Sequence, residues 1–545
     1  MNNKLWWKEK AIYQIYPRSF CDSNNDGIGD IPGIISKMDY LKDLGIGAIW
    51  LSPVYQSPND DMGYDISDYY SINPEYGTLE DMKRLFAEAK KRDIRIIMDL
   101  VINHTSDEHA WFKEGIDPTS PYHDYYIWKP GKTGKKGKAL PPNNWQSFFT
   151  GSAWEKNETN GEFYLHLFTK KQPDLNYRNP AVIAEVKKIL RFWLDLGASG
   201  FRCDVINIIY KTSFEDGKKK IYKTGLEHYL SQPGCHKILK EFNDEIFAPY
   251  GAYTVGETTD IDLQAAKTFT EGELSTIFPF DHTSVDQWKL PLFHVRYEPR
   301  KMIAALTKWQ ENLDWNTIFF ENHDQPRSLT RFGDEKKYRN ESAKMLATIL
   351  LTLRGTCYIF EGEEIGMTNC AFNGVSELRD ISSVNVYNLL RKVHVWHKLA
   401  WKLVMNFTRD HGRTPMQWND LPNAGFSEDA PWLKVNPQYP LINVEREQRD
   451  PNSIWHYYHD LLHLKDQAAG LKEGTFKKLP SHPDVFAFIR ETATEKYLVV
   501  ANMSNKNRPI RLPMLGTKII GNYPATNYRG VKKLFPYETV VIKQK

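Results

Sequence analysis

Charged side chains that could act together in catalysis stand at the ends of several buried, β-branched runs of this sequence. Arg202 and Asp204 end one run, Glu257 ends another, and His323 and Asp324 end a third. Because Arg202 and Asp204 are two residues apart, they face the same side of an extended strand, where the cation can keep the carboxylate ionised. A pair of carboxyl groups in opposite charge states is what glycosidic bond cleavage requires, since one attacks while the other donates a proton.

A further run ends in Asp99, Asn103 and His104. Any one of these charged residues alone is explained as easily by a structural ion pair. Several carboxylates at one place repel one another, however, and each desolvated charge costs several kcal/mol unless it is paired. The whole set of strand ends therefore favours a reaction centre over a stabilising network.

The residue types predict distinct roles at such a centre. Asp204, beside Arg202, suits the ionised nucleophile, and Glu257, between apolar neighbours in VGET, suits a general acid with a raised pKa. Asp324 would stabilise the positive charge of an oxocarbenium-like transition state, while His104 and His323 would bond sugar hydroxyls. Aromatic residues, 13% of the chain, would add flat apolar platforms for sugar rings.

The elements that must position these residues alternate between short apolar strands and helices. Helical periods cover 34–44, 79–92 behind Thr78 as a cap, and 181–196 behind Asn179 and Pro180. Eight βα units of this kind indicate a TIM barrel, in which reacting groups lie at the carboxyl ends of the strands. The predicted strand regions are 11–17, 48–54, 95–104, 200–206, 252–258, 273–280, 316–324 and 357–366.

Two segments break this rhythm. Residues 105–177 are rich in Trp, Tyr, Pro and Gly without a helical period, which predicts a loop-rich subdomain inserted after strand three. Residues 475–545 contain short strands such as VFAFIRE and predict a small antiparallel domain. The barrel itself is then expected to comprise 1–104 and 178–474.

Composition limits the possible partners and location. The 545 residues carry 71 basic and 68 acidic side chains, so the net charge of +3 favours no nucleic acid partner. Five cysteines without CxxC spacing suit reduced thiols. No signal peptide or membrane-spanning run is readable. We therefore expect a cytoplasmic protein that contacts neither nucleic acid nor membrane. The reaction centre described above makes a small oligosaccharide the expected substrate, and we expect the protein to be a monomer.

The loop DSNNDGIGD, residues 22–30, matches the first nine positions of an EF-hand calcium loop. The match ends at position twelve, which is Gly33 instead of Glu, and the chain before the loop is predicted as a strand. Two interpretations remain open on the residues alone, a structural cation site and a polar turn without an ion. A calcium sensor is disfavoured because a single such loop offers no paired switch.

Taken in order, four segments resemble the signature segments of the α-amylase family of retaining glycoside hydrolases. They are DLVINH (99–104), GFRCD (200–204), VGET (255–258) and ENHD (321–324). The resemblance covers essentially the whole chain. It implies Asp204 as nucleophile, Glu257 as acid/base and Asp324 as transition-state stabiliser, on a barrel with an inserted subdomain and a C-terminal β-sandwich.

Within the family, four further segments are most similar to the oligo-1,6-glucosidase and dextran glucosidase branch. They are WWKEKAIYQIYPRSF at the start, SPNDDMGYDISDY, KKQPDLNY and GRTPMQW. The resemblance implies a glucose pocket closed at one end, which releases one sugar at a time. The pocket residues implied are Asp61, Tyr64, His104, Phe149, Phe168, Gln172, Arg202, His323 and Arg413. Calcium is also implied, with Asp22, Asn24, Asp26, the carbonyl of Ile28 and Asp30 as ligands.

Preference for α-1,6 bonds is inferred from Val205, which is similar to the residue of that branch, and from QPDLN. The alternatives are an α-1,4-glucosidase, a sucrose hydrolase or isomerase, and a trehalose-6-phosphate hydrolase. Residues 278–289, FPFDHTSVDQWK, lack the Arg-rich loop of the isomerases, and no phosphate-binding cluster is readable. A non-catalytic amylase-like partner protein is disfavoured because the three acidic residues are kept and no membrane anchor is readable.

Three positions depart from these relatives. Cys203 replaces a usual Met, Glu321 replaces a usual Asn, and FEGEE (360–364) replaces YQGEE. None of them removes a catalytic group. The added carboxylate of Glu321 is expected to be able to shift the titration of Asp324 or of the acid/base.

Overall fold

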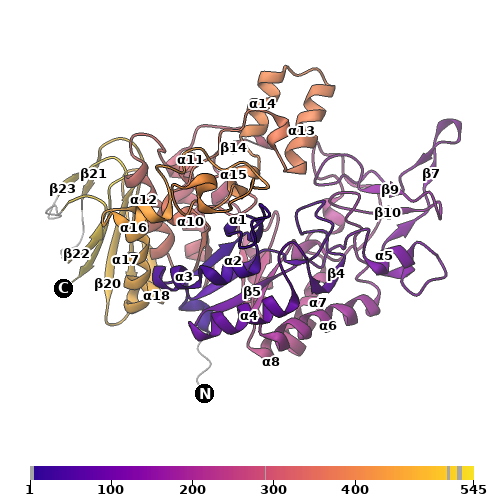
Figure 1. Ribbon diagram of the computed structural model, residues 1–545, viewed down its shortest axis with the longest axis horizontal. Helices are drawn as coiled ribbons and strands as arrows, with labels where there is room; N and C mark the ends of the chain where they lie inside the picture. The colour runs from indigo at the N-terminus through magenta and orange to yellow at the C-terminus, as the bar shows by residue number, and fades with distance from the viewer. Residues whose placement is uncertain (1–4, 289, 512–515, 525–530, 545) are drawn as a thin grey trace.

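A barrel of eight parallel strands forms the centre of the computed structural model, which describes residues 5–288, 290–511, 516–524 and 531–544 (Figure 1). The strands pair in the order β13, β12, β11, β5, β2, β1, β17, β16. Between the two end strands, the Thr317 hydroxyl donates to the Ile277 carbonyl at 2.6 Å, so the barrel is nearly closed. The predicted TIM barrel is thus confirmed. Its strands are β1 (Ile12–Ile15), β2 (Ala48–Leu51), β5 (Arg95–Leu100), β11 (Gly200–Cys203), β12 (Tyr253–Glu257), β13 (Thr276–Phe278), β16 (Thr317–Ile318) and β17 (Thr356–Phe360).

The barrel strands are buried on both faces, as their apolar runs predict. Every residue of β1, β2, β11 and β17 is buried. Helices cover the outside and side chains fill the inside, so polar alternation is absent. The strands are shorter than the predicted runs. In 95–104, for example, strand pairing stops at Leu100, and the last four residues turn into a loop over the barrel mouth.

Two predicted helices begin at their predicted caps, and a third predicted helix is divided in two. The helix α4 (Leu79–Lys91) begins with a capping box between Thr78 and Asp81, and α6 (Pro180–Leu196) begins where Asn179 accepts from the Ala181 N–H. The predicted single helix over 34–44 is wrong. It is two helices, α2 (Ile31–Ser36) and α3 (Met38–Leu44), because Lys37 leaves the helical conformation between them.

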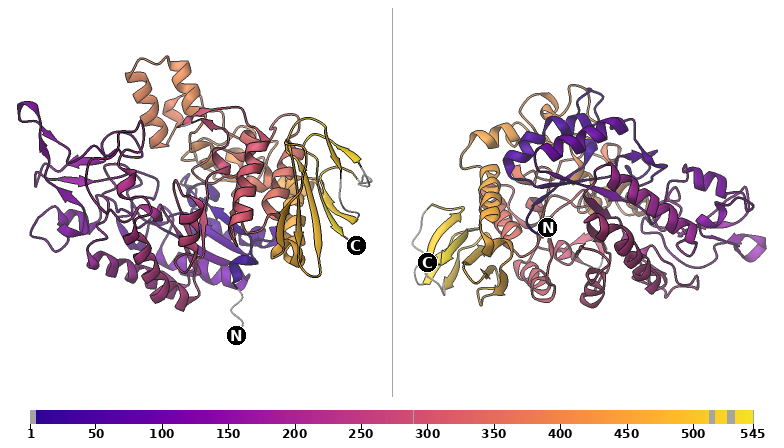
Figure 2. Two further views of the ribbon diagram at one scale, coloured as in Figure 1. Left: turned by 180° about the vertical axis from the view of Figure 1, so that it is seen from behind. Right: turned by 90° about the horizontal axis from the view of Figure 1, so that it is seen from below.

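The remaining barrel helices surround the strands, as the view from below shows (Figure 2). Each follows a strand in the chain, and all except α12 pack one apolar side inward, whereas α12 is buried on every side from Ser342 to Thr352. They are α7 (Pro233–Phe242), α9 (Leu263–Thr270), α10 (Pro299–Asn312), α12 (Arg339–Thr352) and α17 (Ile454–Gln467). This arrangement leaves the strand ends and the loops after them free to build a site.

The inserted subdomain and the C-terminal domain lie at opposite ends of the molecule (Figures 1 and 2). Between β5 and α6 the chain forms a short helix, α5 (Ala110–Gly115), a hairpin of β7 (Lys132–Thr133) and β8 (Ala139–Leu140), and an antiparallel sheet of β6 (Trp128–Lys129), β10 (Phe163–Leu165) and β9 (Trp154–Lys156). The C-terminal antiparallel sheet has the order β18 (Thr475–Lys478), β19 (Val485–Glu491), β20 (Lys496–Asn502), β24 (Thr539–Gln544) and β22 (Gly516–Gly521), beside a pair of β21 (Arg508–Arg511) and β23 (Val531–Leu534). The outer ends of the predicted domains, residues 1 and 545, and Lys289 lie outside the described residues.

A helical hairpin that the sequence did not predict follows β17. It consists of α13 (Ile381–Lys392) and α14 (His397–Met405) and lies next to the inserted subdomain (Figures 1 and 2). The short helix α15 (Asp410–Arg413) comes after it and returns the chain to the barrel mouth. Hairpin and subdomain together flank the region where the predicted reactive residues meet.

Candidate functional site

Strand register places an arginine between three carboxylates at the barrel mouth. Arg202 on β11 lies beside Asp99 on β5, and its Nη1 donates to Asp99 at 2.9 Å and to Asp204 at 2.7 Å. Its Nη2 donates to Glu257, at the end of β12. Both predicted reactive carboxyl groups are therefore bonded to one guanidinium fork, which places them in one site.

The surroundings of Asp204 and Glu257 differ from those predicted. Burial raises the pKa of Asp204 well above its ordinary range, and the nearby carboxylates of Glu257 and Asp99 add to this effect against the charge of Arg202. Glu257 does not lie among apolar neighbours, because Arg202 and the backbone N–H of Val205 both point to its Oε2. The direction for Asp204 is therefore opposite to the ionised state that the sequence predicted for it, because burial outweighs the charge of Arg202.

Val205, directly after Asp204, has a strained backbone. Its φ is 36° and its ψ is 38°, a left-handed conformation that β-branched residues rarely adopt. Such strain costs of order 1–3 kcal/mol and persists only where the surrounding structure imposes it. Here the turn aims the Val205 N–H at Glu257, 3.4 Å away, while the chain leaves the strand.

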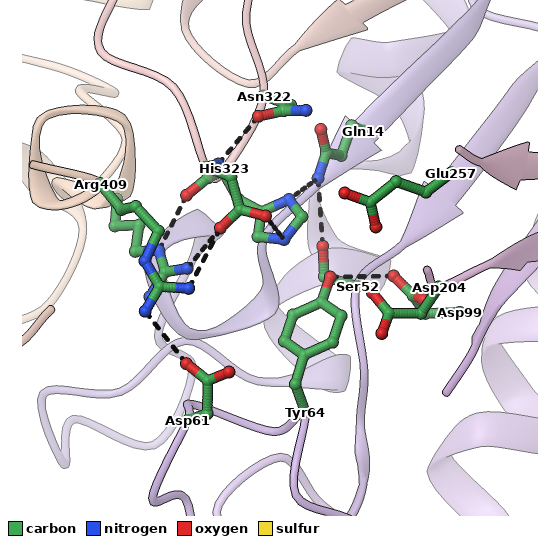
Figure 3. A network of polar contacts seen from close by, with 12 residues as sticks. Gln14, Ser52, Asp61, Tyr64, Asp99, Asp204, Glu257, Asn322, His323 and Arg409 are labelled. Carbon is green, nitrogen blue, oxygen red and sulfur yellow. Dashed lines mark hydrogen bonds and ion pairs between the residues drawn. The ribbon is translucent and has the colours of Figure 1, made fainter. Parts of the chain in front are cut away.

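His323 is held as a neutral donor in the pocket. The Gln14 amide donates to its Nδ1 at 2.7 Å, so the ring hydrogen is on Nε2, which faces the Asp324 carboxylate at 3.3 Å and has no hydrogen-bond partner. Burial lowers the pKa of His323 to about 3. Tyr64 stacks on one ring face with centroids 5.2 Å apart, and Tyr16 stacks at 5.9 Å. Figure 3 shows this arrangement around Gln14 and Tyr64.

Asp324 lies between two arginines. Arg413 donates to its Oδ1 at 2.8 Å, and Arg409 approaches the same oxygen at 3.3 Å. Burial would raise the pKa of Asp324, but His323 and the two arginines outweigh burial and lower it below its ordinary range. This carboxylate is therefore ionised in the folded protein.

Arg409 also contacts two further carboxylates and an aromatic ring of the site. It donates to Asp61 at 3.0 Å and to Asp380 at 2.7 Å, and its guanidinium lies 5.3 Å from the centroid of the Phe149 ring. In Figure 3, Asp61 and Arg409 lie on one side of His323, and Asp204 and Glu257 lie on the other. The ion pairs of Arg409 thus lie across the site from the reactive carboxyl groups.

The inserted subdomain supplies a further wall. Gln172 donates to Asp61 at 3.4 Å and to the Tyr64 carbonyl at 3.2 Å, and Phe168 packs on His104 with centroids 5.0 Å apart. His104 Nε2 lies 2.9 Å from the same Tyr64 carbonyl, so this nitrogen bonds the backbone instead of facing the open cavity. Burial lowers the pKa of His104 to about 4. The structure thereby brings all predicted pocket and reactive residues into one connected set.

Sequence reasoning missed several members of this set. Arg409 and Asp380 stand on no strand end, and Gln14 and Ser52 are single polar residues on or directly after barrel strands. The available sequence signal for Arg409 was its spacing from Arg413, four residues on in RDHGR. One turn of helix places two such residues on the same face. Gln14 is buried at 1% exposure, and its place as the one amide in the apolar run AIYQIYP was a readable sequence signal for a buried polar role.

Comparison with known proteins identifies the family of this site. The family model described as "Alpha amylase, catalytic domain" matches residues 14–474. The chain belongs to the α-amylase family of glycoside hydrolases. A second model, the "Alpha-amylase SusG C-terminal domain", matches residues 485–541. The resemblance seen in the four signature segments is thus confirmed, and the enzyme is a glycoside hydrolase.

Relatives of this enzyme carry more than one activity in their names. It is 46% identical to an oligo-1,6-glucosidase of Parageobacillus thermoglucosidasius, over 99% of both chains. The crystal structure of a trehalose-6-phosphate hydrolase of Bacillus licheniformis is similar with a TM-score of 0.94 at 40% identity, covering 99% of both chains. An isomaltulose synthase of Klebsiella sp. LX3 is similar with a TM-score of 0.95 at 40% identity, also over 99% of both.

The loop 22–30 of the enzyme is held by its own hydrogen bonds. Asp22 accepts from the backbone N–H groups of Asn24, Asn25 and Gly27 at 2.8–3.0 Å. Asp30 caps α2 at the Gly33 N–H, 2.6 Å away. Within the described residues no three acidic, histidine or cysteine side chains form a group that could hold a metal ion. The oxygen donors fit calcium by chemistry, but the side chains do not form a ready cluster.

The departures noted in the sequence do not touch the reactive carboxyl groups. Glu321 is buried and accepts from Arg327 at 3.0 Å and from the Ser328 N–H. Glu361 accepts from the Tyr16 N–H at 2.9 Å and so supports the ring beneath His323. Cys203 is free and buried, as are the other four cysteines. No helix in the described part of the enzyme has the length and hydropathy needed to cross a bilayer.

Proposed function

We propose that the protein is a retaining, exo-acting α-glucosidase that hydrolyses α-1,6-glucosidic bonds at the non-reducing end of isomalto-oligosaccharides. The observation that carries the proposal is the Arg202 fork, which bonds Asp204 and Glu257 together at the mouth of the barrel. Retaining hydrolysis needs two carboxyl groups about 5–5.5 Å apart across the scissile bond. An arginine bonded to both fits that spacing better than the wider gap that an inverting enzyme needs for a water molecule.

In the proposed reaction, Asp204 attacks the anomeric carbon and forms a glucosyl ester while Glu257 protonates the leaving oxygen. Water then enters, Glu257 accepts its proton, and hydrolysis of the ester restores Asp204. This reaction requires Glu257 to carry a proton and Asp204 to be ionised when the leaving group departs. Binding of substrate between the two groups would displace Glu257 from Arg202 and leave the Arg202 bond to Asp204, which favours that distribution.

Ionised Asp324 would stabilise the cationic transition state, and Arg413 keeps it in that charge state. The unpartnered Nε2–H of His323 would donate to a glucose hydroxyl nearby. The wall of Asp61 and Arg409 supports exo action, because a glucose that reaches it has no room for a further sugar on its non-reducing side.

The α-1,6 preference is supported by Val205 and by the identity to oligo-1,6-glucosidases. A β-branched side chain directly after the nucleophile narrows the acceptor side of the cavity. The relatives named as trehalose-6-phosphate hydrolase and isomaltulose synthase define the competing specificities.

Parallel incubation with isomaltose, maltose, sucrose and trehalose 6-phosphate tests the proposal. We expect the largest kcat/KM for isomaltose, with α-glucose as the first product detected by proton NMR. Faster cleavage of maltose or trehalose 6-phosphate would reject the linkage assignment. Isomaltulose or trehalulose from sucrose would reject hydrolysis as the main activity.

A further inference from the structure

A buried lysine and a buried cysteine contact each other on the outer side of the barrel. The Nζ of Lys465 on α17 lies 2.8 Å from the Sγ of Cys357 on β17. Cys357 is 1% exposed and Lys465 is 6% exposed. The next residue of the strand, Tyr358, contacts Trp50 inside the barrel, so Cys357 points outward to the helices. Neither residue of the pair belongs to the site described above.

The side chain of Lys465 is poorly satisfied as an ammonium ion. An ammonium group has three donors, but the contacts of this one are the thiol, which is a weak acceptor, and the Gly355 carbonyl at 3.4 Å. It forms no ion pair with a carboxylate in the described part of the chain. Burial lowers the pKa of Lys465 against the effect of Cys357, and the charge of Arg490 acts in the same direction as burial. The surroundings therefore favour the neutral amine, which is a nucleophile.

The two side chains are close enough to react. The 2.8 Å between nitrogen and sulfur is shorter than the roughly 3–3.5 Å at which reacting atoms are held for attack. Cys357 donates its thiol hydrogen to the Leu350 carbonyl at 3.1 Å, which leaves a sulfur lone pair facing Lys465. A sulfenic acid is an electrophile, and a nitrogen in contact with its sulfur can displace the hydroxyl to give a sulfenamide. The pair therefore needs only an oxidant to become linked.

A small cavity allows an oxidant to approach the pair. Its volume is about 130 Å³, and Lys465 lines it together with Ala11 and Gly47. These two residues directly precede β1 and β2, so the cavity lies at the amino ends of the strands, at the opposite end of the barrel from the reactive carboxyl groups. A water molecule takes up roughly 30 Å³ of liquid. Hydrogen peroxide, an uncharged molecule with two oxygen atoms, therefore fits in this space.

We propose that Cys357 and Lys465 are a redox modification site and form a covalent N–S link when hydrogen peroxide reaches them. The sulfur attacks one peroxide oxygen, the O–O bond breaks, and the second oxygen leaves as water with the thiol hydrogen. The amine then attacks the sulfur of the sulfenic acid. The N–S bond forms, the S–O bond breaks, and the hydroxyl leaves as water with one hydrogen from the nitrogen. The sulfur is oxidised by two electrons, and the peroxide is reduced by two.

The link joins the last barrel strand to a helix 108 residues later in the chain. Such a cross-link restricts the unfolded chain as a disulfide does, so the oxidised protein resists heat better than the reduced one. A reducing thiol reverses the link, because it attacks the sulfur and releases the amine. This modification is independent of the glycosidase function proposed above, since it involves none of the pocket residues.

The test treats the wild-type protein with hydrogen peroxide, blocks free thiols, digests it with trypsin without reductant and identifies the products by mass spectrometry. Trypsin needs a free lysine amine. Linked Lys465 therefore leaves residues 450–472 uncut and joined to 355–379. The product should be about 2 Da lighter than the two separate peptides, as one N–S bond replaces two bonds to hydrogen. Dithiothreitol should separate them. Complete cleavage after Lys465, with Cys357 found only as the thiol or as its oxygen acids, would overturn the proposal.

Three variants locate the link. Cys357→Ser and Lys465→Arg should each abolish it, because the first lacks the sulfur and the second lacks the primary amine. Cys370→Ser, at the other cysteine of the same tryptic peptide, is the matched control and should keep the link. A link that persists in Cys357→Ser, or that is lost in Cys370→Ser, would contradict the assignment. The wild-type digest decides the proposal even if a variant fails to fold.

Thermal unfolding provides a second measurement. Peroxide should raise the thermal midpoint of the wild-type protein by about 2–4 °C, and dithiothreitol should restore it. The midpoint of Cys357→Ser should not rise with peroxide. An equal rise in both proteins would contradict a link between these two residues as its cause.

Discussion

Arg202 balances the charge of three carboxylates at 2% exposure, and the reactivity of the site depends on how that balance changes when substrate arrives. Asp99 is fixed by Trp50 and Tyr64 as well, at 3.1 and 3.0 Å. It therefore serves to hold the arginine, which leaves the other two carboxyl groups for chemistry. Burial raises the pKa of Asp99 to about 6 against the opposing charge of Arg202, which is consistent with a structural role for this carboxyl group.

Replacing the proposed nucleophile should abolish turnover without unfolding the protein. Asp204→Asn keeps the side-chain volume but removes the attacking oxygen, so kcat on isomaltose should fall roughly a thousandfold or more, about 4 kcal/mol of barrier. The thermal midpoint should change little. Asp260→Asn, at an exposed carboxylate that pairs with Lys223, is the matched control and should retain full activity. Near-normal turnover of Asp204→Asn would reject the assignment.

At the scale of elements, the turn after β11 contains the strained residue Val205, which in the proposed function borders the acceptor side of the site. Val205→Thr retains the branched shape but adds a polar group, and Val205→Ala removes bulk. We expect both to raise the ratio of kcat/KM for maltose to that for isomaltose, by about tenfold for Val205→Ala, since one or two methyl groups in a pocket are worth roughly 1–3 kcal/mol.

Val205→Ile is the control, because it preserves an apolar, β-branched side chain and should keep the isomaltose preference. Steady-state kinetics on both disaccharides measures the ratio. An unchanged ratio in Val205→Ala would show that the acceptor side is not shaped by this residue.

We propose that the loop after β1 binds one calcium ion through Asp22, Asn24, Asp26, the Ile28 carbonyl and Asp30. All five donors are oxygens, the set that calcium prefers. Removal of the ion by a chelator should lower the thermal midpoint by several degrees while kcat falls much less, because the loop is held apart from the reactive carboxyl groups. Scanning calorimetry should measure the thermal midpoints of the wild-type protein and of Asp26→Ala, each with and without added calcium.

Calcium should restore the midpoint of the wild-type protein and have little effect on Asp26→Ala. If neither chelator nor added calcium changes the midpoint, the loop is a polar turn without an ion. Hydrogen bonds such as those from the Asn24 and Gly27 N–H groups to Asp22 would then hold it.

At the scale of the whole molecule, sequence predicted the elements better than it predicted their junctions. The eight strands were readable because apolar runs buried on both faces have a strong signal, and the reactive residues were readable because they stand where strands end. Arg409 and the α13–α14 hairpin were not readable from the sequence, since their roles depend on contacts between segments distant in sequence. The break at Lys37 was hidden because residues on both sides of it keep the same apolar face.

Buried neutral histidines should make the whole fold sensitive to acid. Burial lowers the pKa of His323 to about 3 and of His104, His109, His282 and His411 to about 4. Below the ordinary value near 6.5 the unfolded chain binds protons that the folded protein excludes, so stability is complete above that pH and decreases as pH falls toward 4. Each such group contributes up to roughly 3 kcal/mol to the loss.

Denaturant unfolding at a series of pH values between 4 and 7 measures this loss. His282→Gln, at a histidine outside the pocket, should reduce the pH dependence, whereas His394→Gln at an exposed position should leave it unchanged. Equal slopes for the wild type and His282→Gln would contradict the expectation for this residue.

The ion pair of Asp61 and Arg409 has a consequence for the order of events after each cut. Under the proposed exo action, glucose released at the innermost position would be trapped behind the shortened chain, since both would share one exit. The shortened chain would then have to leave the enzyme first, and it could not slide forward for another cut. Degradation would be distributive, one glucose per encounter, and chains of every intermediate length would accumulate before the shortest ones disappear.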